Sequence, residues 1–282
     1  MLSLISVQFQ DSHLLPKMFK SALFARKKTT TRPFADFYND WSTTLATTLL
    51  PQLRRALSSF PVCPAVLSTQ VDAVYNHFHA YYTALDQAAA ADVAQCLYPE
   101  WRNSLEKPFL WLGDLHPYLF TNLLRSFLED QESSQDENDD SEYDVTSTKE
   151  SLYTSWNVAA AWRSPSKALT ARVDQIACGL RLMVPALAVR ARHAQAKLVR
   201  NVGAEWGRKE GVVKAAMAAE MEELVGVVVD ANRLRRSVLA DVLSVTSVYQ
   251  AALFLEAVAQ FLVGFRDEKL LREFDKCEKA IT

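Results

Sequence analysis

Histidine and cysteine side chains are the first candidates for chemistry in this sequence, because they serve as metal ligands, general bases and nucleophiles. His77 and His79 are two residues apart, which on a helix places them on opposite faces, so we do not expect them to share a metal ion. The four cysteines have no C-x-x-C spacing and no base or second ligand near them. We expect them to be small buried apolar residues in a reducing compartment.

Acidic residues and glycines give no catalytic pattern either. Glu220, Glu222 and Glu223 lie within four residues and are typical of a polar helix face rather than an acid–base pair. The three glycines between residues 203 and 211 lack the preceding strand that a phosphate-binding loop needs. The sequence therefore predicts a protein that is not an enzyme and that has no catalytic residue, metal site, cofactor or small-molecule substrate.

A basic patch is predicted between Asp174 and Glu205, a stretch that contains no acidic residue. Its cations are Arg181, Arg190, Arg192, Lys197 and Arg200. One interpretation is a solvated helix face; the other is contact with an acidic peptide, a lipid headgroup or nucleic acid. Nucleic acid is the weakest of these partners, because no aromatic residues are interleaved with the cations and no known reading motif accompanies them.

The densest group of aromatic residues lies between Tyr98 and Phe120, where six aromatic side chains and three prolines occur within 23 residues. Such a segment can form a rigid corner between helices, with its indole N–H groups bound to buried partners. It can also form a protein-docking surface, since Trp, Tyr and Arg dominate binding hot spots. Both interpretations stay open at the level of sequence.

The elements that must position these residues are predicted to be helices. The chain of 282 residues has only 7 glycines, a net charge of −2 and 49% hydrophobic residues, which is typical of a globular helical protein. Apolar residues recur every three or four positions over 34–53, 71–85 and 173–187, and Pro51 should kink or end the first of these helices. A short third helix is expected to carry Val93, Leu97 and Trp101 on one side. Residues 212–229 and 234–265 are predicted to be two core helices, so the fold class is all-α, a multi-helix bundle.

Four segments follow from the distribution of charge. Residues 1–33 are predicted to be a flexible basic leader, residues 34–270 a single all-α domain, residues 129–150 a disordered acidic insertion within it, and residues 271–282 a C-terminal tail. The insertion carries ten acidic residues against one lysine. The cations of the leader are Lys17, Lys20, Arg26, Lys27, Lys28 and Arg32. They could hold the chain weakly against an anionic membrane surface.

The aromatic segment resembles a pattern of the plant delay-of-germination domain, in which a Trp, a Glu and a second Trp precede a Gly-Gly-x-Arg-Pro-Ser segment. The residues that match it are Trp101, Glu106, Trp111, Gly113 and Pro117. The residues that replace the family's Gly, Arg and Ser are Asp114, His116 and Tyr118. Residues 34–41, 231–243 and 249–255 also resemble family segments, so the resemblance covers roughly residues 34–265.

Within that family, residues 110–128 and the short basic leader most resemble the inaperturate pollen branch. The resemblance implies a non-enzymatic protein that specifies pollen apertures by marking plasma-membrane domains through protein partners, among them a second copy of the chain. It implies a cytoplasmic protein recruited to membrane patches. One alternative is a nuclear co-regulator that binds bZIP transcription factors or DNA. A second alternative is a helical sensor of haem or of a small molecule.

Overall fold

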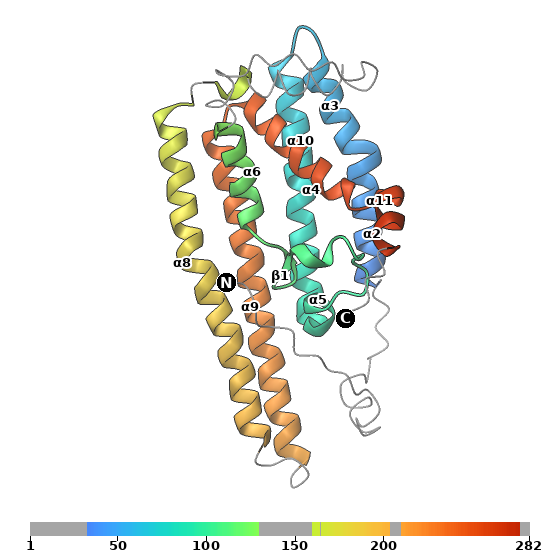
Figure 1. Cartoon of the computed structure of the whole chain (residues 1–282), viewed down its shortest axis with the longest axis vertical. Helices are drawn as coiled ribbons and strands as arrows, with labels where there is room; N and C mark the ends of the chain where they lie inside the picture. Colours follow the sequence, from blue (N-terminus) through green and yellow to red (C-terminus); the bar gives the residue numbers. More distant parts are fainter. Residues whose placement is uncertain (1–32, 130–159, 164, 204–209, 277–282) are drawn as a thin grey trace.

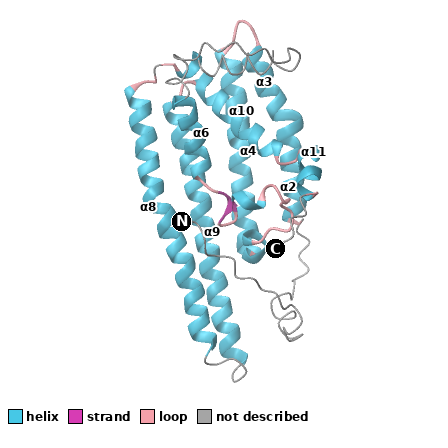
Figure 2. Ribbon diagram, in the orientation of Figure 1, coloured by secondary structure: helices cyan, strands magenta, loops and turns pink. Residues whose placement is uncertain are grey.

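The computed structural model describes residues 33–129, 160–163, 165–203 and 210–276. Helices joined by short loops make up most of this part of the chain, and its only β structure is a small two-stranded hairpin (Figures 1 and 2). The predicted all-α bundle is therefore confirmed. The basic leader and the acidic insertion lie outside the described residues, apart from Pro33 and Glu129.

The first helical run does not end at Pro51; its hydrogen-bonding pattern changes just before the proline. Helix α2 (Phe34–Thr44) continues through a π-helical segment, η1 (Leu45–Leu49), into α3 (Leu50–Ser58). Proline has no N–H to donate to the carbonyl four residues earlier, and its ring collides with that carbonyl. A wider π turn just before the proline accommodates both effects.

Two helices form the centre of the bundle. Helix α4 (Pro64–Ala91) packs against α2, α3, α9 and α10. Helix α10 (Val248–Gly264) is buried around most of its circumference, which explains why its sequence is apolar on every side. The helix predicted to carry Trp101 is shorter than expected, because α5 (Val93–Leu97) ends at Leu97 and Trp101 lies in the following loop.

Helices α8 (Lys167–Gly203) and α9 (Glu210–Val245) are the longest elements and pack along each other. Figure 1 shows that the end of α8 and the start of α9 project beyond the other helices as a two-helix arm. The expected boundary near residue 230 is wrong, because α9 runs through it. The polar residues there bind groups on other elements: Asp230 pairs with Arg190 of α8, and Asn232 donates to Asp86 of α4. The chain instead breaks at Ser247, whose side chain caps α10 through a capping box with Gln250.

The remaining described elements lie between α5 and α8 or at the C-terminal end. A short 3₁₀ turn, η2 (Lys107–Phe109), leads into β1 (Leu110–Trp111) and β2 (Asp114–Leu115), and α6 (Tyr118–Glu129) follows. Helix α11 (Glu268–Asp275) crosses the boundary expected at residue 270. None of the described helices is by itself long and apolar enough to cross a membrane, and only α10 and α11 taken together, with a bend of 47° between them, meet that test.

Candidate functional site

The aromatic segment folds into a tight antiparallel hairpin, residues 110–115, in which Leu110 pairs with Leu115 and Trp111 with Asp114. The two turn residues, Leu112 and Gly113, have φ angles of +46° and +93°, as a two-residue turn of this hand requires. A Cβ atom added to Gly113 would lie 3.3 Å from Cγ1 of Val228 on α9. The glycine therefore permits both the turn and its close approach to α9.

A buried arginine on α9, Arg235, holds this hairpin in place through hydrogen bonds to its backbone. The guanidinium of Arg235 donates hydrogen bonds to the carbonyl oxygens of Leu115 (2.7 Å), Asp114 (3.1 Å) and Trp111. It also donates to Oδ1 of Asn232 at 2.7 Å, and Asn232 in turn donates to Asp86 on α4. Burial lowers the pKa of Arg235, but guanidinium stays protonated in proteins, so a full positive charge sits against the hairpin backbone.

A second buried arginine, Arg102, links the hairpin to α2 and α4. Its guanidinium donates to Oδ1 of Asp114 (2.5 Å) and to the hydroxyls of Tyr81 (2.5 Å) and Tyr38 (2.9 Å). Tyr38 donates its hydroxyl hydrogen to Glu106 at 2.6 Å. Burial opposes the charge on Arg102, but its neighbours Tyr81 and Asp114 raise its pKa above the ordinary value. Burial raises the pKa of Tyr38 and Tyr81, so both phenols stay neutral.

The predicted corner residues divide into two groups in the structure. The fully buried ones are Glu106, Gly113, Asp114 and Pro117. The half-buried ones are Trp101, Trp111, His116 and Tyr118. The buried group supports the structural interpretation, whereas the rings of the second group are partly open to solvent.

Three of these half-buried rings form a continuous surface, which we call the aromatic face: Trp111, His116 and Tyr118. The ring centroids of Trp111 and His116 are 5.0 Å apart, and those of His116 and Tyr118 are 4.9 Å apart. The backbone N–H of Tyr118 donates to Nδ1 of His116 at 3.2 Å, so the neutral ring carries its hydrogen on Nε2. Burial, and then the charge of Arg235, lower the pKa of His116.

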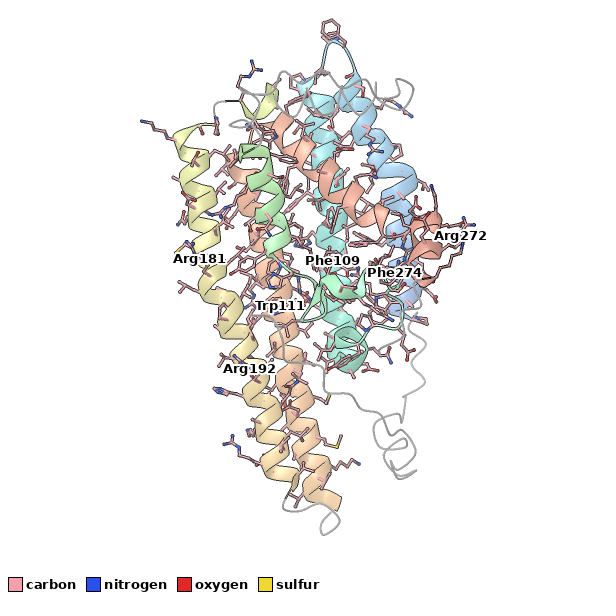
Figure 3. All side chains as sticks on the ribbon, in the orientation of Figure 1. Phe109, Trp111, Arg181, Arg192, Arg272 and Phe274 are labelled. Carbon is pink, nitrogen blue, oxygen red and sulfur yellow. The ribbon has the colours of Figure 1, made fainter. Side chains whose placement is uncertain are left out.

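The basic patch lies apart from the hairpin, along α8 (Figure 3). Arg190, one of its five residues, is not a free cation. It forms ion pairs with Glu223 (2.5 Å) and Asp230 (2.6 Å) of α9, and it passes over Gly226, where an added Cβ would lie 2.7 Å from its Nη2. Arg181, Arg192, Lys197 and Arg200 are exposed.

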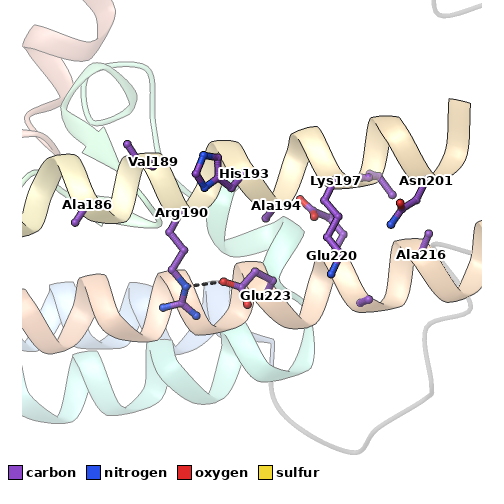
Figure 4. Close-up of a pocket in the computed structure, with 12 residues that line it drawn as sticks. Ala186, Val189, Arg190, His193, Ala194, Lys197, Asn201, Ala216, Glu220 and Glu223 are labelled. Carbon is purple, nitrogen blue, oxygen red and sulfur yellow. Dashed lines mark hydrogen bonds and ion pairs between the residues drawn. The ribbon is translucent and has the colours of Figure 1, made fainter.

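A groove beside the patch separates α8 from α9 (Figure 4). His193 and Lys197 line its α8 side, and Glu220 and Glu223 line its α9 side. Oε1 of the buried Glu220 has no hydrogen-bond partner among the described residues. Burial, and then the nearby Glu223, raise the pKa of Glu220, while Lys197 opposes them.

The remaining candidates for chemistry are placed as follows. His77 is half-buried, stacks on Trp41 with centroids 5.0 Å apart, and has its pKa lowered by burial, whereas His79 is exposed. Cys63 and Cys178 are exposed rather than buried, because Cys63 lies in the loop before α4 and Cys178 on the outer side of α8; only Cys96 among the described cysteines is buried. In the described ranges no three His, Cys, Asp or Glu side chains are grouped so that they could hold a metal ion.

Sequence reasoning missed both arginines that hold the hairpin. A signal for Arg235 was present: the buried residues of α9 follow a three-and-four spacing, namely Val228, Ala231, Arg235, Val238 and Val242. A charged residue on such an apolar stripe indicates a buried cation with specific partners. Arg102 had a weaker signal, its position four residues before Glu106.

Comparison with known proteins places the chain in a family. The protein INAPERTURATE POLLEN1 of Arabidopsis thaliana is 46% identical over 271 residues, which cover 90% of this chain and 97% of that protein. The chain belongs to the inaperturate pollen family. A homolog from Oryza sativa subsp. japonica, named INAPERTURATE POLLEN 1 homolog, is 37% identical over 88% of this chain and 91% of its own length.

Two further matches concern the chain's resemblance to the delay-of-germination domain. A family model described as "Seed dormancy control" matches residues 49–126, which include α4 and the hairpin. Transcription factor TGA3 of Arabidopsis thaliana is 24% identical over 71% of this chain and 44% of its own length. The resemblance to the delay-of-germination domain and to its inaperturate pollen branch is therefore confirmed.

Proposed function

We propose that this protein acts in the formation of pollen apertures, as a non-enzymatic factor that marks plasma-membrane domains through protein partners. The observation that carries this proposal is the similarity to INAPERTURATE POLLEN1, which extends over nearly the whole length of both chains. Proteins that share almost half of their residues from end to end share their fold and its surfaces, and such surfaces are where a binding protein acts.

The aromatic face is the surface that we propose for a protein partner. Trp111 lies on the hairpin, and His116 and Tyr118 follow it at the start of α6. Arg235 binds the hairpin backbone and Arg102 binds the Asp114 side chain, so little conformational entropy is lost when a partner binds these rings. Partly exposed Trp and Tyr rings on a rigid support are typical of binding hot spots. The hairpin itself brings together no nucleophile and base, which fits a role in binding.

The proposal is tested by expressing this chain in Arabidopsis plants that lack INAPERTURATE POLLEN1. We expect the chain to restore apertures and, as a fluorescent fusion, to gather at patches of the plasma membrane in developing pollen. Trp111→Ala should fold but restore few apertures, while Tyr98→Ala, a change at an aromatic residue that is 80% exposed in the preceding loop, should restore them fully. Restoration by Trp111→Ala as complete as by the unchanged chain would contradict the role of the aromatic face.

A nuclear co-regulator is the second candidate function, and the similarity to Transcription factor TGA3 favours it. The same fluorescent fusion separates the two. Accumulation in the nucleus of developing microspores, without membrane patches, would support the co-regulator and overturn the membrane role.

A further inference from the structure

One side of α8 presents an unusual line of exposed side chains, which we call the outer face. It consists of residues spaced by three or four positions, all exposed: Cys178, Leu182, Ala186, Val189, His193 and Ala196. Leu182 and the nearby Val199 are each 70% exposed. The opposite side of α8, with Leu180, Val184 and Leu187, is buried, so the helix has two apolar sides of which one is covered.

Cations flank this line on both sides, and no acidic residue interrupts it. At 100° per residue, Arg181 and Arg192 project from one flank of the outer face, Lys197 from the other, and Arg200 continues the line. In the described ranges, no ion pair joins Arg181, Arg192 or Arg200 to an acidic residue.

The acidic groups nearest to this line, on α8 and α9, are paired or buried. On α9, Glu223 and Asp230 are paired with Arg190 on the groove side, and Glu220 forms the groove floor. Toward α6, Asp174 is paired with Arg125 at 3.6 Å. The outer face is therefore an apolar line in a field that is positive along the whole stretch from residue 175 to residue 203.

This pattern selects its partner by charge. A second copy cannot pair outer face to outer face, because like charges would meet along both flanks. An acidic peptide would gain most by entering the adjoining groove, but the carboxylates of Glu220 and Glu223 line that groove and would repel it. Val189 and His193 of the outer face also border this groove. Within it Glu220 is only 5% exposed and Glu223 is paired with Arg190, so a flat anionic surface resting on α8 meets little free negative charge.

We propose that the outer face of α8 is a docking surface for a bilayer that contains anionic lipid. An apolar line flanked by basic side chains is the arrangement of helices that lie in the plane of a membrane interface, where Arg and Lys reach the headgroups. Helix α8 is an edge element of the bundle (Figures 1 and 3) and has 37 residues, so it can lie along a membrane over most of its length. Arg181, Arg192 and Arg200, at about 1 kcal/mol each, give weak and reversible attachment. The inference rests on the proposed function in one respect only, namely which membrane of the cell the outer face would meet.

The test measures binding of the purified full-length chain to vesicles. One set contains phosphatidylcholine alone, and the other contains about 30% phosphatidylserine, a content that gives a surface potential typical of anionic membranes. The variant is Arg181→Glu combined with Arg192→Glu. Its control is Arg55→Glu combined with Lys269→Glu, two exposed residues on α3 and α11, which changes the net charge by the same amount and leaves the basic leader intact.

We expect the unchanged chain and the control to bind the anionic vesicles and not the neutral ones, with weaker binding at higher salt. The α8 variant should bind at least about thirtyfold more weakly, because the loss of two cations at about 1 kcal/mol each accounts for that factor and the two new carboxylates add repulsion. Leu182→Ser should weaken binding as well and leave its salt dependence unchanged. Equal binding by the α8 variant and the control, or no binding by the unchanged chain, would overturn the proposal.

An α8 variant that binds vesicles normally but loses an acidic protein partner would also overturn it, in favour of that partner. Failure of the proposed function looks different: the unchanged chain would bind anionic vesicles through α8 and still not restore apertures in plants.

Discussion

Arg235 is the single side chain on which the hairpin most depends, because it donates to the carbonyl oxygens of Trp111, Asp114 and Leu115. Arg235→Met should lower the free energy of unfolding by about 3–5 kcal/mol, since removing the guanidinium leaves three buried carbonyl oxygens and Oδ1 of Asn232 without their donor. Denaturant unfolding measures this loss. Arg233→Met, at a side chain that is 72% exposed in a surface ion pair, should change it by less than about 1 kcal/mol. Equal effects of the two would show that Arg235 does not hold the hairpin.

His116 gives the aromatic face a dependence on pH. Its pKa is lowered in the folded chain, so the unfolded chain binds a proton first, and stability should fall as the pH drops below about 6.5. Protonation of Nδ1 would also remove the acceptor for the N–H of Tyr118. His116→Asn keeps an acceptor oxygen near that position but cannot titrate, so the fall in melting temperature between neutral and mildly acidic pH should be smaller in this variant.

His77 contributes to the same slope, because burial lowers its pKa as well, and this part should remain in His116→Asn. His79→Asn, at an exposed position on the same helix as His77, serves as the control. An unchanged slope in His116→Asn would refute the role of His116.

At the scale of elements, replacing glycine by alanine should lower the stability of the chain in the hairpin and raise it in α8. Gly113→Ala should destabilise the chain by about 1–2 kcal/mol, because alanine is strained at a φ of +93° and its Cβ would press on Val228. Gly179→Ala should stabilise it by about 1 kcal/mol, since this glycine lies within α8 with open space around it. Denaturant midpoints of the two variants measure the contrast. A loss of stability in both would show that α8 needs the glycine for a contact that lies outside the described residues.

At the scale of the whole molecule, stability should differ between the bundle and the arm. Helix α10 is buried by α3, α4, α6 and α9, whereas α8 and α9 project beyond the other helices at their connected ends (Figure 1). Local opening costs least where few apolar contacts are lost. Backbone amides at residues 195–203 and 210–218 should therefore exchange hydrogen at least about tenfold faster than those of α10. Mass-spectrometric hydrogen exchange measures the ratio, and equal protection would indicate that the arm is covered by another part of the chain or by a partner.

The sequence determined the helical class, the position of most helices and the family. Spacing of three or four between apolar residues survives in α2, α4 and α8 because each of these helices buries one stripe. The spacing of apolar residues did not predict helix boundaries correctly where a helix is buried on every side or carries buried charged residues. Periodicity could not locate the break at Ser247, and the polar residues near position 232 suggested a break that does not exist.

Only the tertiary structure decided what the aromatic segment and the basic patch are. The sequence identified Trp111, His116 and Tyr118 but could not separate a structural corner from a binding surface, because that depends on which ring faces solvent. Arg102 and Arg235 lie 12 residues before and 121 residues after Asp114, and only folding brings them to it and to its carbonyl oxygen. Likewise, Arg190 differs from Arg181 and Arg192 only because α9 places Glu223 and Asp230 beside it. Local composition determines which side chains can carry charge or pack, whereas partners distant in the chain determine which of those charges are neutralised and which stay free to bind.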